Sequence, residues 1–295
     1  METQRTTANG IDIAYETFGD PDGVPLLLVM GLGTQMIAWP DDMCTALADL
    51  GHYVVRFDNR DIGLSTHLRE VRAPNPLAVS LRRVPPPYTL ADMAEDALGL
   101  LTGLGVTAAH VVGASMGGFI AQTMALRDPA RVRSLTLIMT STGSRRVGNP
   151  KPAMARRLLR RRPVLDRESA VALSVDVMRS IGSPGYTFDE AALVDLARRS
   201  YDRAYDPGGY LRQLAAISAQ PDRTAALRRL TVPAVVMHGL SDPLVAPSGG
   251  LALAKALRGS TFVGFPGMGH DLPRELWGRY VEIIGGLTAR ADAHT

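Results

Sequence analysis

The stretch HVVGASMGG, residues 110–118, decides the fold because it joins three local signals. The apolar residues before Gly113 predict a buried strand, and a helical stretch from Phe119 to Arg127 follows closely. Between them lies the pattern Gly-x-Ser-x-Gly, centred on Ser115. A sharp turn from strand to helix forces this serine into strained backbone angles, and only glycines let the neighbouring backbone come so close. The pattern therefore predicts a serine hydroxyl held clear of the sheet.

Other apolar runs recur along the chain with helical stretches between them. They cover residues 24–30, 53–57, 110–112, 134–139, 233–237 and 261–265. Runs that are apolar at nearly every position suit strands buried on both faces, as in a parallel sheet covered by helices. The sequence thus predicts a mostly parallel, doubly wound α/β core. One helix is well marked, because Thr89 and Asp92 predict a capping box at its start and Gly105 predicts its end.

The apolar runs that predict strands are missing between Gly143 and about Arg223. There the sequence is helical in character and contains several prolines. We predict a helical cap, residues 143–223, inserted into a core of residues 1–142 and 224–295. The cap should lie over the carboxyl edge of the sheet, where α/β proteins bind ligands. Its arginines are typical of a solvated helix face. They are Arg156, Arg157, Arg160, Arg161, Arg162 and Arg167.

Composition excludes several classes of protein. The 295 residues are 46% hydrophobic and 21% charged, which excludes global disorder and collagen-like or coiled-coil chains. The single cysteine, Cys44, excludes an intramolecular disulfide and a cysteine-based zinc site. Every apolar run is far shorter than the ~18 residues of a membrane span, and a secretory signal is not expected. We expect a cytoplasmic protein, and the net charge of +3 predicts no nucleic-acid partner.

A serine hydroxyl is a weak nucleophile at neutral pH, so a base and an orienting acid are needed elsewhere in the chain. His270 follows the last predicted strand in a glycine-containing loop, where an imidazole can reach a catalytic centre. The other histidines fit structural or solvated roles; they are His52, His67, His110, His238 and His294. Asp242 follows a late strand and precedes His270, which gives the order Ser, Asp, His. Helix capping is the alternative role for Asp242.

Attack on a carbonyl also needs hydrogen-bond donors for the developing oxyanion. Met116 follows Ser115, and its backbone N–H lies at a predicted helix start. We expect the second donor, the Leu32 N–H, from the glycine-rich loop after the first long strand. Trp39 lies close behind that loop in the sequence and is a candidate for lining the substrate pocket.

The whole chain resembles the α/β-hydrolase superfamily, on segments that span nearly all of it except the predicted cap. They are LLVMGLG (27–33), Trp39 and Pro40, FDNRDIGLS (57–65), HVVGASMGG (110–118), HGLSDP (238–243) and FPGMGHDLP (265–273). Core-plus-cap members include proline iminopeptidases and haloperoxidase-like perhydrolases, and the chain looks most similar to aclacinomycin methylesterase-like members. The resemblance implies Ser115, Asp242 and His270 as a catalytic triad, with Leu32 and Met116 as oxyanion donors.

The chain departs from most superfamily members at two positions. It has Met30 before Gly31 where most members have histidine, and Asp61 where most have glycine. Methylesterase-like members share both departures. Without this histidine, the loop that carries Leu32 lacks one side-chain hydrogen bond that would hold it in place. Asp58 and Arg60 fit structural ions better than catalytic groups.

The predicted function is that of a carboxylic-ester hydrolase acting through an acyl-enzyme on Ser115, with no metal or organic cofactor. The serine argues against haloalkane dehalogenases and epoxide hydrolases, which need a carboxylate nucleophile. The expected partner is a small or medium, largely apolar ester. A thioesterase, lactonase, iminopeptidase or perhydrolase would use the same triad, and an iminopeptidase would also need cap carboxylates such as Asp189, Glu190 or Asp195. A non-catalytic ligand receptor on the same fold is the alternative of a different class.

Overall fold

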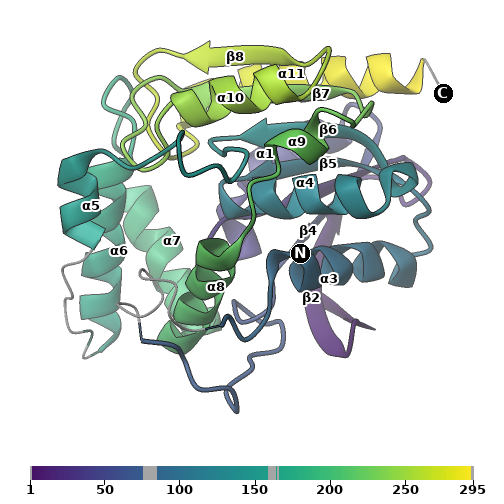
Figure 1. Cartoon of the computed structure of the whole chain (residues 1–295). Helices are drawn as coiled ribbons and strands as arrows, with labels where there is room; N and C mark the ends of the chain where they lie inside the picture. The colour runs from purple at the N-terminus through teal and green to yellow at the C-terminus, as the bar shows by residue number, and fades with distance from the viewer. Residues whose placement is uncertain (1, 76–84, 159–163, 165, 294–295) are drawn as a thin grey trace.

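Eight strands form one sheet in the computed structural model, which describes residues 2–75, 85–158, 164 and 166–293 (Figure 1). Their order across the sheet is β1-β2-β4-β3-β5-β6-β7-β8, antiparallel at β1-β2 and β2-β4 and parallel at every other pair. The strands are β1 (Gln4–Ala8), β2 (Ile11–Phe18), β3 (Val24–Val29), β4 (His52–Phe57), β5 (Ala109–Ala114), β6 (Val132–Ile138), β7 (Ala234–Gly239) and β8 (Thr261–Phe265).

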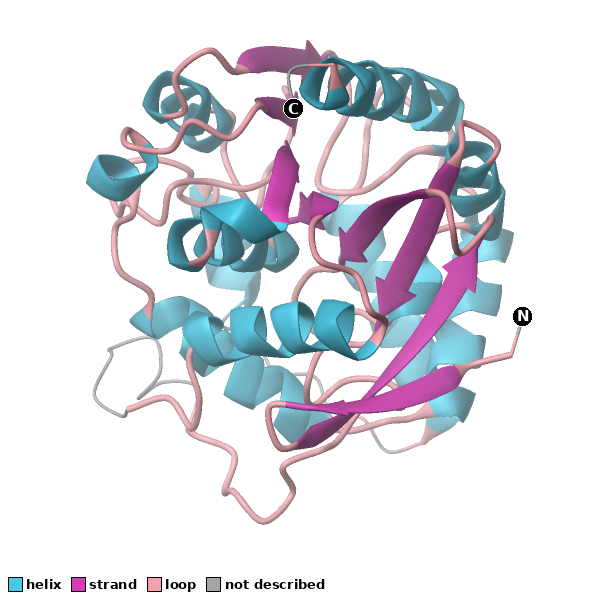
Figure 2. Cartoon of the chain, turned by 90° about the vertical axis from the view of Figure 1, so that its right-hand side faces the viewer, coloured by secondary structure: helices cyan, strands magenta, loops and turns pink. Residues whose placement is uncertain are grey.

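Helices cover both faces of this twisted sheet (Figure 2). Those packed against the sheet include α1 (Asp41–Ala48), α3 (Leu90–Gly103), α4 (Met116–Arg127), α10 (Ser248–Ala256) and α11 (Trp277–Asp292). Successive residues of β3 face opposite ways: Leu27 belongs to the core cluster with α3 and α4, and Leu28 to the cluster with α1 and α11. Each strand is therefore apolar at nearly every position because both of its faces are buried.

The six predicted strands are present, with bounds that differ by at most two residues, and they confirm the mostly parallel core. The sequence analysis missed β1 and β2. Four of the five residues of β1 are polar and this edge strand is largely exposed, so it shows no apolar run. Asn9 and Gly10, with φ of 50° and 76°, join the two strands, and such an Asn-Gly pair is the sequence signal for a hairpin.

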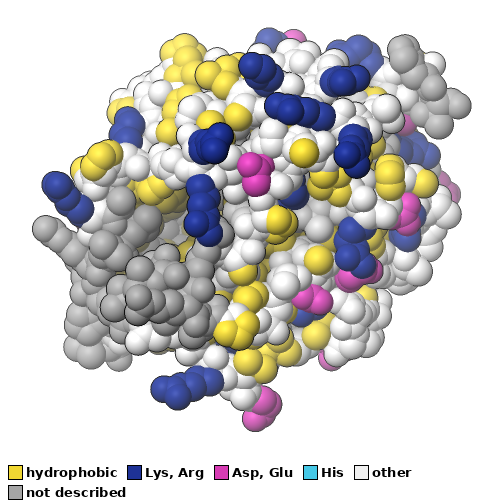
Figure 3. Space-filling model, in the orientation of Figure 1, with side chains coloured by type: hydrophobic (Ala, Val, Ile, Leu, Met, Phe, Trp, Pro, Cys, Tyr) yellow, Lys and Arg dark blue, Asp and Glu magenta, His cyan; other side chains and the backbone are white. Residues whose placement is uncertain are grey.

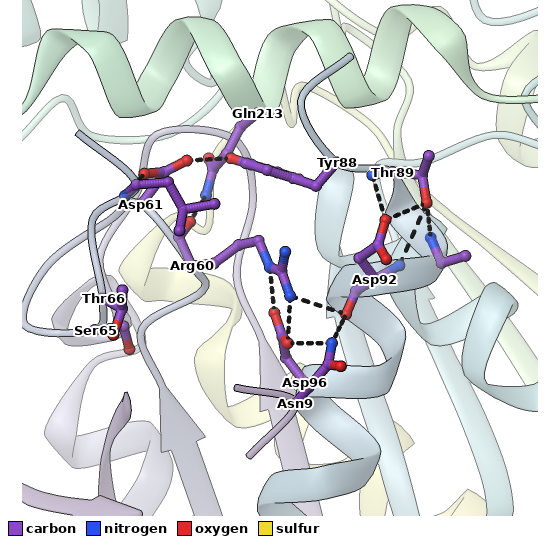
Figure 4. Close-up of polar contacts among 12 residues, drawn as sticks. Asn9, Arg60, Asp61, Ser65, Thr66, Tyr88, Thr89, Asp92, Asp96 and Gln213 are labelled. Atoms are coloured by element: carbon purple, nitrogen blue, oxygen red, sulfur yellow. Dashed lines mark hydrogen bonds and ion pairs between the residues drawn. The ribbon is translucent and has the colours of Figure 1, made fainter. Parts of the chain in front are cut away.

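The predicted capping box before α3 is present (Figure 4). The backbone N–H of Thr89 donates to the Asp92 carboxylate at 2.7 Å, and the Asp92 N–H donates back to the Thr89 hydroxyl at 3.4 Å. The helix ends at Gly103, and Gly105 takes the left-handed φ of 72° expected just beyond a helix. This places β5, and therefore Ser115, directly after a well-defined helix.

Within residues 143–223 the described part of the chain is helical and contains no strand. Its helices are α5 (Pro152–Leu158), α6 (Arg167–Ile181), α7 (Glu190–Arg203) and α8 (Pro207–Ala219). They gather at one end of the molecule, beside the sheet and its covering helices (Figure 1). The short α9 (Thr224–Leu227) then leads back to β7. The bounds of the cap stay a prediction.

On the face in Figure 3, Lys and Arg side chains lie among apolar and acidic ones. In the predicted cap, Arg157 pairs with Asp176 and Arg167 pairs with Asp202 at 2.6 Å. Arg160, Arg161 and Arg162 lie outside the described residues. Within the described ranges, no helix combines the length and apolar character needed to cross a membrane.

Candidate active site

Ser115 lies between β5 and α4 in a turn that we name the nucleophile turn, residues 113–118. Its φ of 55° and ψ of −116° are strained for a residue with a side chain. The glycines explain how the turn fits: a Cβ on Gly113 would lie 2.4 Å from the Gly117 carbonyl oxygen, and one on Gly117 would lie 2.0 Å from that of Val29. The predicted steric reason for the two glycines is therefore confirmed.

Asp242 and His270 reach Ser115 from the loops that follow β7 and β8. The His270 Nδ1 lies 2.7 Å from the Asp242 Oδ2, and the His270 Nε2 lies 3.0 Å from the Ser115 Oγ. Both separations are hydrogen-bond distances, so carboxylate, imidazole and hydroxyl form one continuous chain. The structure thus brings the three predicted residues together, although they span more than half of the sequence.

The Asp242 carboxylate is fixed by its own loop. It is fully buried, and its Oδ1 accepts hydrogen bonds from the backbone N–H groups of Leu244 and Val245, each at 2.8 Å. The Oδ2 is thereby left to the imidazole of His270. The alternative role of helix cap does not apply, because α10 begins only at Ser248.

A second buried histidine, His238, lies beside the same carboxylate. Its Nε2 is 3.6 Å from the Asp242 Oδ2 but only 2.9 Å from the Val245 carbonyl oxygen, which can only accept. The hydrogen bond therefore assigns the proton of the neutral ring to Nε2. Burial lowers the pKa of His238, so this ring is neutral and does not compete with His270 for the negative charge.

The loop that carries His270, residues 266–273, is named the histidine loop. It is hydrogen-bonded to the end of α6 and to the segment that follows α6. The His270 N–H donates to the Ile181 carbonyl at 2.7 Å, and the Gly269 N–H donates to the Ser183 hydroxyl at 2.8 Å. The Ser183 hydroxyl in turn donates to the Asp271 carboxylate, whose pKa is raised by burial. The sequence analysis missed these contacts, because neither segment shows a pattern that pairs it with the other.

The two candidate oxyanion donors belong to separate segments of the chain. Met116 is the first residue of α4, where a backbone N–H has no partner within the helix. Leu32 belongs to residues 30–34, which we name the oxyanion loop. A Cβ on Gly31 would lie 3.2 Å from the Ser115 Cβ, so this loop passes directly beside Ser115. Among the described residues, no group accepts a hydrogen bond from the Leu32 N–H.

The oxyanion loop is braced although it lacks the histidine found in most superfamily members. The Asn59 side-chain amide donates to the Met30 carbonyl at 3.0 Å. The Gly33 N–H donates to the Gln213 side-chain oxygen at 2.9 Å, and Gln213 comes from α8. These two amide side chains hold the loop at both ends, and the sequence analysis assigned no role to either.

Trp39 belongs to the core cluster that contains Met43 and Leu47 of α1 and also Met30, and 0% of its surface is exposed. The short helix Met36–Ala38 precedes it, and the chain then enters α1, which packs against β4. Because the side chain is fully buried in this core cluster, the lining of a substrate pocket by Trp39 stays a prediction.

The charged residues after β4 form buried ion pairs. Arg60 pairs with Asp96 at 2.6 Å, as Figure 4 shows, and Asp58 pairs with Arg203 at 3.1 Å. Asp61, whose φ of 71° suits the glycine found there in most superfamily members, receives two hydrogen bonds from Arg212 of α8, at 2.7 and 2.8 Å. These contacts fit the structural role expected of Asp58 and Arg60.

One group of side chains has the spacing of metal ligands: Asp61, His67 and Asp206 offer atoms within 4.8 Å of one another. Arg212 donates to both of these carboxylates, to Asp61 at 2.7 Å and to Asp206 at 3.1 Å. A guanidinium thus already supplies the positive charge that a cation would bring.

The remaining histidines have structural partners where they are described. His52 contacts the Thr288 hydroxyl, His67 contacts Asp206, and His110 contacts Ser134 and Asp292. His294 lies outside the described residues.

A family model described as the α/β hydrolase fold matches residues 24–273. The chain belongs to the α/β-hydrolase fold family. It is 30% identical to the rhodomycin D methylesterase DauP of Streptomyces sp. (strain C5), over 100% of this chain and 98% of the relative.

Two solved structures show the same fold. The enol-lactonase from Burkholderia xenovorans LB400 has a TM-score of 0.74 and 24% identity, over 97% of this chain and 100% of its own. An esterase from Thermogutta terrifontis has a TM-score of 0.73 and 22% identity, over 99% of each chain. The comparisons confirm the predicted fold and family, and they confirm a carboxylic-ester hydrolase as the class of enzyme. The roles of individual residues stay predictions.

Proposed function

We propose that the protein hydrolyses carboxylic esters through an acyl-enzyme on Ser115, with His270 as general base and Asp242 as the group that orients it. The observation that carries this proposal is the unbroken hydrogen-bonded chain from Asp242 through His270 to Ser115, at 2.7 and 3.0 Å. Carboxylate, imidazole and hydroxyl in this order are the parts that a serine hydrolase needs.

In the first half of the reaction, the Ser115 Oγ bonds to the ester carbonyl carbon while its proton passes to the His270 Nε2. The carbonyl oxygen becomes an oxyanion, which the N–H groups of Leu32 and Met116 stabilise. When the carbon–oxygen bond to the alcohol breaks, His270 returns the proton to the leaving alcohol. An acyl group remains on Ser115.

In the second half, water attacks the acyl carbon while His270 takes one of its protons. The Ser115 oxygen then leaves and receives that proton, which releases the carboxylic acid and restores the enzyme. Asp242 stays ionised and stabilises the imidazolium in both halves. Each step moves only protons and acyl groups between groups present in the protein, the ester and water.

The substrate that we propose is a small or medium, largely apolar ester, and full-length similarity to a rhodomycin D methylesterase supports methyl esters in particular. The iminopeptidase alternative has less support. Asp189 caps α7, Glu190 pairs with Arg179 and Asp195 pairs with Arg199, so all three candidate carboxylates are engaged. The cytoplasmic location stays a prediction.

The test is a panel of p-nitrophenyl esters of increasing acyl length, with thioesters, a lactone, a proline amide and a methyl ester. We expect ester turnover that Ser115→Ala lowers about 10⁶-fold, because the nucleophile of a serine hydrolase carries most of its catalysis. A fluorophosphonate should label wild type but not Ser115→Ala. Ser260→Ala is the matched control, since Ser260 lies before β8, at the opposite end of that strand from His270. Full activity in Ser115→Ala would refute the mechanism, and unlabelled wild type without turnover would indicate a receptor.

A further inference from the structure

Gln213 of α8 links two loops of the core through both ends of its side-chain amide. Its Oε1 accepts a hydrogen bond from the Gly33 N–H at 2.9 Å, and its Nε2 donates to the Arg60 carbonyl at 2.8 Å. The side chain is fully buried, and Figure 4 shows it reaching from its helix toward the loop of Arg60 and Asp61. A buried amide is costly unless both its donor and its acceptor are satisfied, so these two contacts hold Gln213 in one position.

The contact with Gly33 fixes one peptide of the oxyanion loop. The Leu32–Gly33 peptide is held at both edges, because its N–H donates to Gln213 and its carbonyl accepts from the Thr34 hydroxyl at 3.2 Å. A planar peptide held at both edges cannot rotate about its flanking bonds. The preceding peptide, which carries the Leu32 N–H, is thereby fixed at one end.

The same helix also covers Gly33. A Cβ built on Gly33 would lie 2.6 Å from the ring of Tyr210, one turn before Gln213 in α8. The helix itself is anchored, because Arg212 donates two hydrogen bonds to the buried Asp61. Because α8 is anchored, Gln213 holds the oxyanion loop in a fixed position relative to the helix.

We infer that Gln213 is a positioning residue for catalysis: it orients the oxyanion loop so that the Leu32 N–H meets the developing oxyanion. The inference rests on the proposed function, in which Leu32 is one of the two donors. Gln213 forms no hydrogen bond with Ser115 or the other two triad residues, so its loss acts through the two loops that it links.

The experiment compares Gln213→Leu with Gln122→Leu. Gln122 is equally buried and also uses both amide ends, donating to Ser141 at 3.0 Å and accepting from Arg223 at 3.2 Å, but it does not contact the oxyanion loop. Removing an oxyanion donor outright costs about 10²- to 10³-fold in kcat. Misplacing one should cost less, so we expect Gln213→Leu to lower kcat about tenfold or more with KM nearly unchanged. Gln122→Leu should keep the wild-type kcat even where its Tm falls.

A transition-state analogue distinguishes a misplaced Leu32 N–H from a general loss of order in the binding site. A trifluoromethyl ketone forms an oxyanion when Ser115 adds to it, whereas the matching methyl ketone binds mainly as a ground-state ligand. Gln213→Leu should weaken the trifluoromethyl ketone by the same factor as kcat and leave the methyl ketone unaffected. The shape of the pH profile should stay that of wild type, because the base is untouched.

Gln213→Glu is a second variant, and its kcat should recover when the glutamic acid is protonated. A protonated glutamic acid can accept from Gly33 and donate to Arg60, whereas its carboxylate can only accept. The kcat of Gln213→Glu relative to wild type should therefore rise as the pH falls. The inference would be overturned if Gln213→Leu kept the wild-type kcat and the wild-type affinity for the trifluoromethyl ketone. It would also be overturned if the only change were a KM above that of wild type. Its failure is distinct from failure of the proposed function, which Ser115→Ala tests separately.

Discussion

The nucleophile turn and the oxyanion loop lie side by side, yet they are held in different ways. The nucleophile turn is shaped by its own glycines and by the strands on either side of β5. No side chain fits at Gly113 or Gly117, and the Ser115 N–H donates to the Ile138 carbonyl of β6 at 2.9 Å. The oxyanion loop depends on partners far along the chain. Asn59 lies 29 residues from Met30, and Gln213 lies 180 residues from Gly33.

The two segments should therefore be disturbed by different kinds of substitution. A turn shaped by local sterics is disturbed only by changes within it or in the strands it touches. A loop held by α8 is disturbed by any change that shifts the helix, including changes that contact no catalytic group. The following predictions test this contrast.

The largest expected effect comes from the anchor of α8. Arg212→Met removes the guanidinium from the fully buried Asp61 and should lower the free energy of unfolding by about 3–5 kcal/mol, because a buried charge loses its partner. Asp61→Asn in the same background should recover part of this loss, since the unpaired charge is then gone. Urea unfolding measures both. Arg167→Met, which breaks an exposed pair with Asp202, is the control and should change little.

The second effect tests the nucleophile turn. Gly117→Ala places a methyl group 2.0 Å from the Val29 carbonyl oxygen, so the backbone of the turn must shift. We expect kcat/KM to fall by about 10²-fold, since small misplacements of a nucleophile have costs of this order. Gly278→Ala is the control, because a Cβ there meets nothing within 4 Å. An active Gly117→Ala enzyme would mean that the turn is not fixed by local sterics.

The third effect is on stability below neutral pH and involves neither region. Burial lowers the pKa of His52 and of His110, both at the starts of their strands. In the unfolded chain these rings titrate at their ordinary value of 6.5, so below that pH the unfolded state binds protons that the folded state does not. Stability should fall by about 1.4 kcal/mol per pH unit for each such proton.

The variant His52→Gln/His110→Gln should lose less stability between pH 7 and pH 5 than wild type does. Urea midpoints at several pH values measure the difference in slope. Equal slopes in the two proteins would show that neither histidine contributes.

The smallest effect concerns the histidine loop, which resembles the oxyanion loop in depending on a distant segment. Ser183→Ala removes one hydrogen bond to Gly269 and one to Asp271, and should lower stability by about 1 kcal/mol with a modest loss of kcat. Ser180→Ala is the control, because its hydroxyl bonds only within α6, to Val177. Equal Tm and kcat in the two variants would show that the tie does not position His270.

The parts of the molecule that the sequence predicted are those with a local cause. Ser115, Asp242 and His270 each follow the end of a strand, and the strands are marked by apolar runs because both faces are buried. The parallel strands place these ends at one edge of the sheet, so their convergence follows from the topology. The capping box of α3 is equally local.

The parts that were missed depend on docking between distant segments. The helix α8 packs against the core through Ala216, but its sequence cannot show that Gln213 meets Gly33 or that Arg212 meets Asp61. The burial of Trp39 was likewise not predicted, because proximity in sequence to the oxyanion loop does not determine which way the chain turns afterwards. The polar strand β1 was missed because an exposed edge strand carries no apolar signal.

The ion pairs that join α7 and α8 to the loop after β4 also determine how this protein can be recombined with its relatives. Arg203 pairs with Asp58 and Arg212 with Asp61, so each pair has one member in residues 143–223 and the other outside them. A chimera whose exchanged residues lack either arginine would leave a buried carboxylate without that partner. A graft of the helical segment should therefore exchange positions 58 and 61 together with residues 143–223.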